Sequence, residues 1–172
     1  MNARSEQNDP GTMSANERAA MKERAAELRA EAKRGRGAAK AEQLAQDVRD
    51  RIAEMPDADR TLAEKVHALV AEEAPALAPK TWYGMPAWAR DGTVVCFFQS
   101  AAKFNARYAT LGFTDPAALD EGTMWATAYA LTAIGADEEQ RIRVLVRRAS
   151  AATLAAAPAA AAEAPADRPA SD

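Results

Sequence analysis

Three carboxylates recur with helical spacing in the first third of the chain. Asp47, Asp50 and Glu54 fall at i, i+3 and i+7, which places them along one face of a helix. Carboxylate oxygens are ligands for divalent cations such as ferrous iron, but a row of single carboxylates without histidine binds a metal weakly and unselectively. Arg51 can also pair with Asp47 at i+4. The spacing leaves two interpretations open, a weak metal site and a solvated acidic face.

A second group of residues combines aromatic rings and a thioether with nearby cations. Gly84 and Pro86 interrupt an aromatic segment, where the glycine permits close approach of a ligand and the proline suits an edge or bulged strand. Because successive side chains of a strand point to opposite faces, the large side chains of this segment cannot all be buried on one face unless the strand bulges. Rings that project beside a lysine and an amide would form a pocket for a small anionic ligand. The candidate ligand site comprises Trp82, Tyr83, Met85, Lys103, Asn105 and Arg107.

Residue types that carry catalysis are scarce. The one histidine, His67, lies beside Val66 at the border of an apolar helix face, and no nucleophile is paired with it. The one cysteine, Cys96, lies among apolar residues of an expected strand, where burial raises a thiol pKa and makes the thiol inert. Gly35 and Gly37 are not preceded by a strand, which argues against a phosphate-binding loop. We therefore predict a binding function and no catalytic residues.

Helical periodicity predicts an N-terminal arm and three core helices. Ser14 and Glu17 have capping-box spacing, and the helix that follows is rich in Ala, Glu, Lys and Arg. Its apolar stripe is narrow, so we expect the arm to dock loosely or to stay free. Pro56 separates two core helices, and a last helix begins at Ala136. The apolar stripes are Met21, Ala25, Leu28 and Ala32; Leu44, Val48, Ile52 and Met55; Leu62, Val66, Leu69 and Val70; and Ile142, Leu145, Val146 and Ala149.

Between the second core helix and the last helix the pattern becomes that of a sheet. Asp91-Gly92 predicts a hairpin turn before a strand over 93–98. Residues 103–111 alternate, with the candidate cations on the polar face, and 123–130 predict a further strand. Sequential strands joined by short turns favour antiparallel pairing. The predicted fold class is α+β, an antiparallel sheet of three to five strands with N- and C-terminal helices packed on one face.

Composition limits the chain to one domain with appendages. It has 172 residues, of which 48% are hydrophobic, a formal charge of -3 and one cysteine. A single cysteine excludes an internal disulfide, and no apolar stretch reaches the roughly 18 residues that span a bilayer. We therefore expect a cytoplasmic protein without a membrane partner. The predicted divisions are disordered ends at 1–13 and 150–172, a helical arm and linker at 14–43, and one domain at 44–149.

A basic cluster lies near the end of the arm. Cations at the C-terminal end of a helix complement the helix dipole. Proteins that bind single-stranded nucleic acid usually combine basic residues with aromatic residues, and no aromatic residue lies within this cluster. We therefore expect no nucleic acid partner. The cluster comprises Lys33, Arg34, Arg36 and Lys40.

Several stretches, taken in order, resemble a known family. They are Ile52-Ala-Glu-Met-Pro56, Thr81-Trp-Tyr-Gly-Met-Pro-Ala-Trp88, the strand 94–98 and the lysine at 103. The chain resembles the YdhG-like family of bacterial proteins, catalogued as domain of unknown function 1801, whose fold is similar to that of frataxin. The resemblance covers roughly residues 44 to 149.

The resemblance implies a weak iron-binding or chaperone-like role, because some relatives have been connected with intracellular iron delivery. Frataxin-type proteins are thought to use an acidic helical ridge, which agrees with Asp47, Asp50 and Glu54 as the metal ligands. Relatives often place a histidine soon after the sheet lysine, whereas Lys103 is followed here by Phe104. The alternative is a small-ligand or protein-interaction module that uses the aromatic and basic sheet face.

Overall fold

The computed structural model describes residues 13–33 and 37–151. Most of the predicted disordered ends, together with Arg34 and Arg36 of the basic cluster, lie outside the described residues. The elements in chain order are α1 (Ala15–Lys33), α2 (Ala38–Ala53), α3 (Asp57–Glu73), β1 (Ala78–Trp82), β2 (Met85–Arg90), β3 (Thr93–Gln99), β4 (Ala109–Phe113), β5 (Ala128–Leu131) and α4 (Ala136–Ala149).

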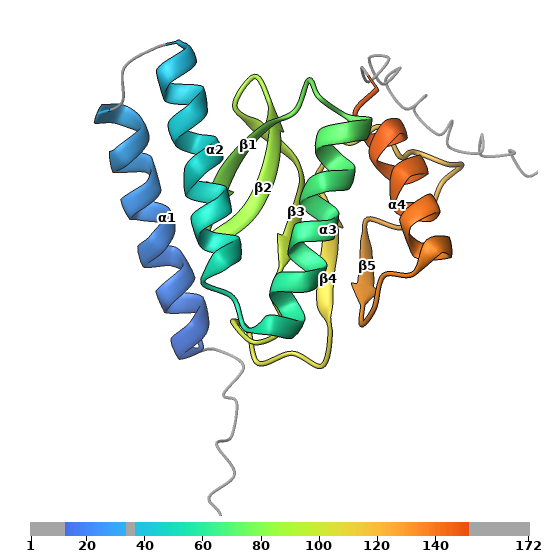
Figure 1. Cartoon of the computed structure of the whole chain (residues 1–172), viewed down its shortest axis with the longest axis horizontal. Coiled ribbons are helices and arrows are strands. Elements are labelled where there is room, and N and C mark those ends of the chain that lie inside the picture. The colour runs from blue at the N-terminus through green and yellow to red at the C-terminus, as the bar shows by residue number, and fades with distance from the viewer. Residues whose placement is uncertain (1–12, 34–36, 152–172) are drawn as a thin grey trace, which may run out of the picture.

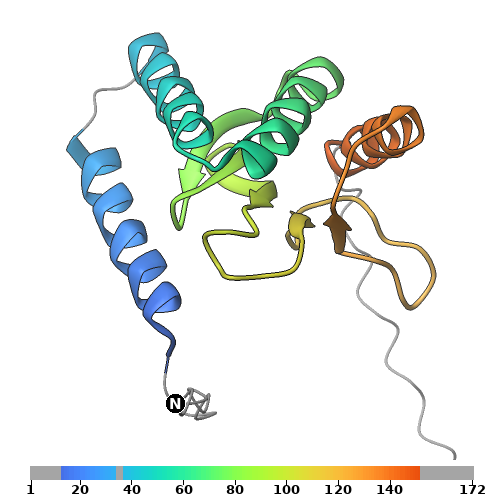
Figure 2. The ribbon, with the colours of Figure 1, turned by 60° about the horizontal axis from the view of Figure 1, so that its bottom comes forward.

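The five strands form one sheet in the order β1-β2-β3-β4-β5, and every neighbouring pair is antiparallel (Figure 1). The helices α2, α3 and α4 cover one face of this sheet, as Figure 2 shows from its end. The predicted α+β class with an antiparallel sheet is confirmed. The strands are connected in chain order as a meander, with two-residue turns from β1 to β2 and from β2 to β3 and longer loops over 100–108 and 114–127.

The core lies between the sheet and these three helices. Trp88, Phe98 and Leu111 project from successive strands and are fully buried against helix residues such as Val66 and Val146. Side chains alternate across a strand, and in β4 the alternate residues Ala109, Leu111 and Phe113 all reach this core. The predicted stripes of the two core helices and the last helix supply the opposite side, and α4 begins at Ala136 as predicted.

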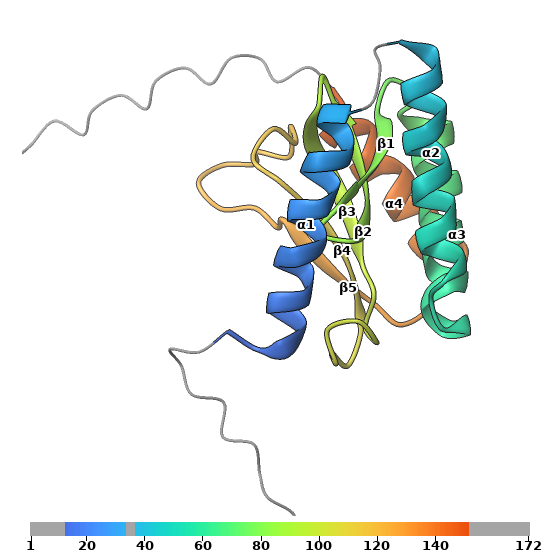
Figure 3. The same ribbon diagram turned by 90° about the vertical axis from the view of Figure 1, so that its left-hand side faces the viewer.

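The helix α1 runs beside β1 at the edge of the sheet (Figure 3). The predicted capping box is present, because Ser14 N donates to Glu17 Oε2 over 2.7 Å and Glu17 N donates to Ser14 Oγ over 3.1 Å. The apolar stripe of α1 does not form its contact with the domain. Met21 and Leu28 of the apolar stripe are exposed, and α1 meets the domain through polar side chains instead.

Three boundaries differ from those predicted. The helix α2 begins at Ala38, so the boundary drawn at residue 44 falls inside it. The strand predicted over 103–111 was wrong over 103–108, since β4 begins at Ala109. The strand predicted over 123–130 begins only at Ala128, and the preceding residues form an exposed loop.

A buried carboxylate explains why Lys103 is not in a strand. Asp59 of α3 accepts hydrogen bonds from Ser100 Oγ and, over 2.9 Å, from Ala102 N. Ser100 Oγ in turn accepts a hydrogen bond from Lys103 N over 3.2 Å. These bonds satisfy backbone groups that a strand would pair with its neighbour, and Asn105 has a φ of 51°, which ends the turn outside β geometry. None of the described helices is both long and apolar enough to cross a membrane.

Candidate anion-binding site

The turn between β1 and β2 consists of Tyr83 and Gly84. Their φ angles are 53° and 69°, and two positive values in succession are what a two-residue type I′ hairpin turn requires. Both backbone N–H groups donate to the carboxylate of Glu27 in α1, over 3.1 Å from Tyr83 N and 2.8 Å from Gly84 N. Successive N–H groups that converge in this way form a small concave site for an anion.

Lys103 closes this site from the loop after β3. Its Nζ donates to the carbonyl oxygen of Tyr83 over 3.0 Å and forms an ion pair with Glu23 of α1. Arg51 of α2 lies on the other side of that carboxylate, with Nη1 3.9 Å from Glu23 Oε1. A lysine from the loop and an arginine from a helix therefore converge on one carboxylate beside the turn.

The absence of a side chain at Gly84 is needed for this arrangement. A Cβ placed at Gly84 would collide with Glu23 Oε2 and with Lys103 Nζ. The positive φ of this residue independently favours glycine. The Gly84 backbone therefore forms the floor on which the Glu23–Lys103 ion pair lies.

A second lysine extends the same surface along β1. The Nζ of Lys80 lies 2.6 Å from Oε1 of Glu31, and only 9% of the lysine side chain is exposed. A buried ammonium is costly unless it is paired, so this contact ties α1 to the strand. We use the term anion site for the set Arg51, Lys80, Tyr83, Gly84 and Lys103.

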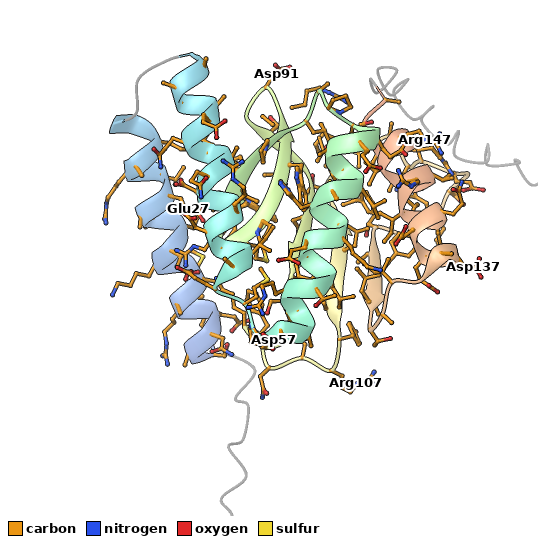
Figure 4. All side chains as sticks on the ribbon, viewed as in Figure 1. Glu27, Asp57, Asp91, Arg107, Asp137 and Arg147 are labelled. Atoms are coloured by element: carbon orange, nitrogen blue, oxygen red, sulfur yellow. The ribbon has the colours of Figure 1, made fainter. Side chains whose placement is uncertain are left out.

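The occupants of the anion site are three glutamates of α1. Glu23, Glu27 and Glu31 fall at i, i+4 and i+8, so they lie along one helix face. In Figure 4, Glu27 lies on the side of α1 that faces the rest of the fold. The Arg24 guanidinium neutralises part of this charge, with Nη1 3.2 Å from Glu27 Oε2 and Cζ 5.7 Å from the centre of the Tyr83 ring.

The aromatic residues support the turn rather than line an open pocket. The Trp82 ring meets the Tyr83 ring edge-on at 5.0 Å between centroids and the Phe97 ring at 5.2 Å. Met85, paired with Trp82 across the turn, is buried. Of the predicted ligand residues, the structure therefore brings together Trp82, Tyr83 and Lys103.

Asn105 and Arg107 do not join this group. Both are exposed in the loop before β4, and the Arg107 guanidinium lies 5.5 Å from the centre of its neighbouring Tyr108 ring. Figure 4 shows Arg107 at the tip of that loop, away from Glu27. The predicted shared face of Lys103, Asn105 and Arg107 was wrong, because it depended on a strand that does not form.

Of the predicted metal ligands, Asp47 and Asp50 lie on α2 and Glu54 is its C-cap residue, and all three are engaged with neighbours. Asp50 Oδ1 accepts a hydrogen bond from Gln46 over 2.7 Å, and Glu54 Oε2 lies 3.2 Å from Arg51 Nη1. Asp47 Oδ1 accepts one from Gln43 over 3.2 Å. Within residues 13–33 and 37–151, no three His, Cys, Asp or Glu side chains are arranged to hold a metal ion. The metal assignment stays a prediction.

A hollow of about 340 Å³ separates α1 from α2 and is lined by both sets of acids. A second hollow of about 440 Å³ lies beside the first turns of α1. Its walls include Asn16, Ala19, Arg51, Gly84 and Lys103. The contact between α1 and the domain is therefore flanked by unfilled space.

Some of these residues were missed by the sequence reasoning. The Glu23, Glu27 and Glu31 spacing was visible by the same rule that singled out the acids of α2. No spacing marks Lys80 or Asp59 for these contacts, and Asp59 reads from the sequence as one of two acids at the start of a helix. Only the tertiary contacts of these two buried residues reveal their roles.

His67 and Cys96 are placed for packing. The His67 ring stacks on Trp88 with centroids 5.9 Å apart, and its Nδ1 has no hydrogen-bond partner among the described residues. Burial, and secondarily the positive charge of Arg49, lower the pKa of His67. Burial raises the pKa of the Cys96 thiol to about 12, so the thiolate is not populated near neutral pH.

No family model, curated protein or solved structure matches this chain. The likeness to the YdhG-like family therefore rests on residues 52–56, 81–88, 94–98 and 103 alone.

Proposed function

We propose that the chain is a binding module that recognises a carboxylate or a similar anionic group at the anion site. The observation that carries this proposal is that two successive N–H groups, those of Tyr83 and Gly84, donate hydrogen bonds to one carboxylate. Hydrogen bonds to an ionised acceptor are about twice as strong as those between neutral groups. The site therefore favours anions over neutral polar groups.

The charges around the turn support the same assignment. Lys103 and Arg51 approach from different elements, and Lys80 adds a buried positive charge on β1. In the structure each of these cations is paired with a glutamate of α1, so the surface already binds carboxylates. This arrangement agrees with the alternative prediction of an interaction module that uses aromatic and basic residues, with Lys103 and Tyr83 as shared members.

Weak iron binding is the second candidate, and the YdhG-like resemblance is proposed with it. The observation in its favour is the hollow between α1 and α2, whose lining includes Asp47, Asp50 and Glu54. Oxygen ligands of this kind suit hard divalent cations. We rank it second because Asp50 and Glu54 are already hydrogen-bonded or paired with neighbouring side chains.

The test of anion recognition uses the full chain with Glu27→Ala, which removes the carboxylate from the two turn amides. Sodium acetate is then titrated at constant ionic strength while amide nuclear magnetic resonance signals are followed. We expect the signals of Tyr83 and Gly84 to shift on substitution and to return toward their parent positions, saturably, as acetate fills the vacated site.

The matched control is Glu42→Ala, which removes an exposed carboxylate that pairs with Arg49 on α2. In that variant acetate should leave the turn amides unchanged, because Glu27 still occupies them. Adding Lys103→Met to Glu27→Ala should weaken the acetate response. Turn amides that ignore acetate in the Glu27→Ala chain would refute anion recognition.

A further inference from the structure

The helix α1 is attached to the domain by charge rather than by apolar burial. Ala20 is the one apolar side chain of α1 that is buried among those described, whereas Met21 and Leu28 are 52% and 50% exposed. The contacts that hold α1 are the ion pairs and hydrogen bonds of Glu23, Glu27 and Glu31 with the anion site. Removing α1 would therefore uncover few apolar groups and leave the core between the sheet and α2–α4 in place.

The anion site is matched to a helix. Its donors contact the glutamates of α1 one after another along the helix. Lys103 pairs with Glu23, the turn amides bind Glu27, and Lys80 pairs with Glu31. Carboxylates eight residues apart on a helix are separated by about 12 Å along the axis. An anion of ordinary size reaches one of these positions, whereas a second acidic helix with the same spacing reaches all three.

Leaving the anion site empty is unfavourable. Without α1, Lys80 and the two turn amides would lose their carboxylate acceptors and keep only water as a partner. The helix α1 is therefore best released by exchange, in which an incoming acid replaces an outgoing one. Exchange selects an acidic occupant over a neutral one.

The helix α1 fills its place incompletely. Ala26 and Ala30 line the hollow between α1 and α2, and Ala19 lines the hollow beside the first turns of α1. Larger side chains at the three equivalent positions of another helix would occupy this space and add apolar contact. Such a helix would combine the charges of α1 with burial that α1 lacks.

We propose that the anion site binds an acidic helix of a partner protein and that α1 occupies the site in its absence. The partner helix presents carboxylates at i, i+4 and i+8 and displaces α1 from the anion site. This inference rests on the proposed function, because it assigns the natural anion to a helix. In the free protein α1 covers the site and restricts binding to partners that carry this spacing.

The experiment supplies α1 in trans. The probe is a fluorescent peptide of residues 14–33 with Ala26→Leu and Ala30→Leu, which keeps the three glutamates and fills the larger space. The receptors are the full parent chain and the full chain with Glu23→Gln, Glu27→Gln and Glu31→Gln, whose own helix no longer competes with charge. Fluorescence anisotropy measures affinity, and the Gly84 amide signal reports the place of binding.

We expect the peptide to bind the substituted chain at least tenfold more tightly than the parent, with a shift of the Gly84 amide. A peptide with Gln at all three glutamate positions should lose at least tenfold in affinity for the same receptor. The matched receptor is Glu17→Gln, which alters an acid of α1 that caps Ser14 rather than the anion site and should behave as the parent.

Equal binding of the acidic and the Gln peptides would overturn the inference, as would failure of the acidic peptide to bind the substituted chain. If acetate still fills the Glu27→Ala site in that case, anion recognition stands and only the helical partner falls. Parent chains that form dimers at increasing concentration, with the Gly84 amide unchanged, would assign the place of α1 to a second copy and also overturn a foreign partner. Thermal unfolding of each variant, followed by tryptophan fluorescence, shows whether the core is retained.

Discussion

The first and last helices of the described chain are attached in different ways. On α4, Ile142, Val146 and Ala149 are buried in the core, and Arg143 adds ion pairs to Glu72 and Glu73 of α3 at 2.5 and 2.7 Å. On α1 the ion pairs are present without such a core face. Both helices carry charge contacts, so the difference between them lies in apolar burial.

This difference in apolar burial determines which helix stabilises the domain and which helix can be exchanged for another. Burial of a large aliphatic side chain contributes about 1.5–3 kcal/mol, whereas a partly exposed ion pair contributes at most about 1 kcal/mol. A helix held by the first kind of contact unfolds with the domain. A helix held by the second kind can leave while the domain stays folded, which is what an exchangeable cover of a binding site requires.

The largest expected effect is at the buried face of α4. Ile142→Ala should lower the free energy of unfolding by about 2–5 kcal/mol, because it removes buried methylene groups and leaves a cavity. Urea denaturation followed by tryptophan fluorescence measures the loss. Val144→Ala on the exposed side of α4 is the control and should change stability little. A loss as small as that of the control would mean that α4 is no better anchored than α1.

Gly84→Ala should have the next largest effect and should act on both stability and α1. The positive φ of this residue strains an alanine by roughly 1–2 kcal/mol, and the new Cβ would displace the Glu23–Lys103 ion pair. Gly92→Ala is the matched control, since Gly92 has a φ of 85° but no neighbour within 4 Å of a built Cβ. Hydrogen exchange should show α1 loosened in the first variant alone. Equal exchange in both would show that backbone strain, and not the ion pair, is what matters.

Added salt should weaken the attachment of α1 more than that of α4, and this effect should be smaller than those of the two substitutions. The screening length falls from about 10 Å at 0.1 M salt to about 3 Å at 1 M, which weakens exposed and half-exposed ion pairs. Amide protection in α1 should decrease over this range, whereas α4 keeps its apolar anchor and its protection. Hydrogen exchange at both salt concentrations is the measurement, and a parallel loss in the two helices would remove the distinction.

Much of the core followed from periodicity. The stripe through Ile142 and Val146 recurs with a helical period, and the helix it predicts begins where the structure has it. The Asp91-Gly92 turn was likewise visible, because two-residue hairpin turns need residues that tolerate positive φ. The matching turn at Tyr83 was missed, since tyrosine rarely adopts positive φ.

The candidate site was less accessible from the sequence. Lys103 was identified as a ligand residue, but its neighbours were placed on a strand that Asp59 prevents through bonds to the following loop. The contact face of α1 was also not predicted, because periodicity detects apolar faces and Glu27 contacts the turn through a carboxylate. Polar contacts between distant segments leave no repeating signal in the chain.

A modest pH effect should act on the core rather than on α1. Burial lowers the pKa of His67 below its ordinary value of 6.5, and the charge of Arg49 lowers it further. In acid the unfolded chain binds the proton first, so stability should fall as the pH drops below about 6.5 and level off once the folded histidine is protonated. Urea midpoints from pH 8 downward measure the slope, and His67→Gln should remove this part of it. A slope that survives the substitution would belong to other groups.

The smallest expected effect is metal binding at the acids of α2. A bound cation would fill the hollow between α1 and α2 and so add a contact that α1 lacks in the comparison with α4. Asp47, Asp50 and Glu54 offer oxygen ligands only, and water competes for each of them, so binding should be weak and poorly selective. We expect ferrous iron to bind no more tightly than about micromolar, which corresponds to about 8 kcal/mol, and manganese to compete with it. Anaerobic titration calorimetry of the parent and of the combined Asp47→Ala, Asp50→Ala and Glu54→Ala variant measures this. Should the parent give no heat, or the combined variant bind equally well, these acids are a solvated helix face and the hollow has no metal to hold.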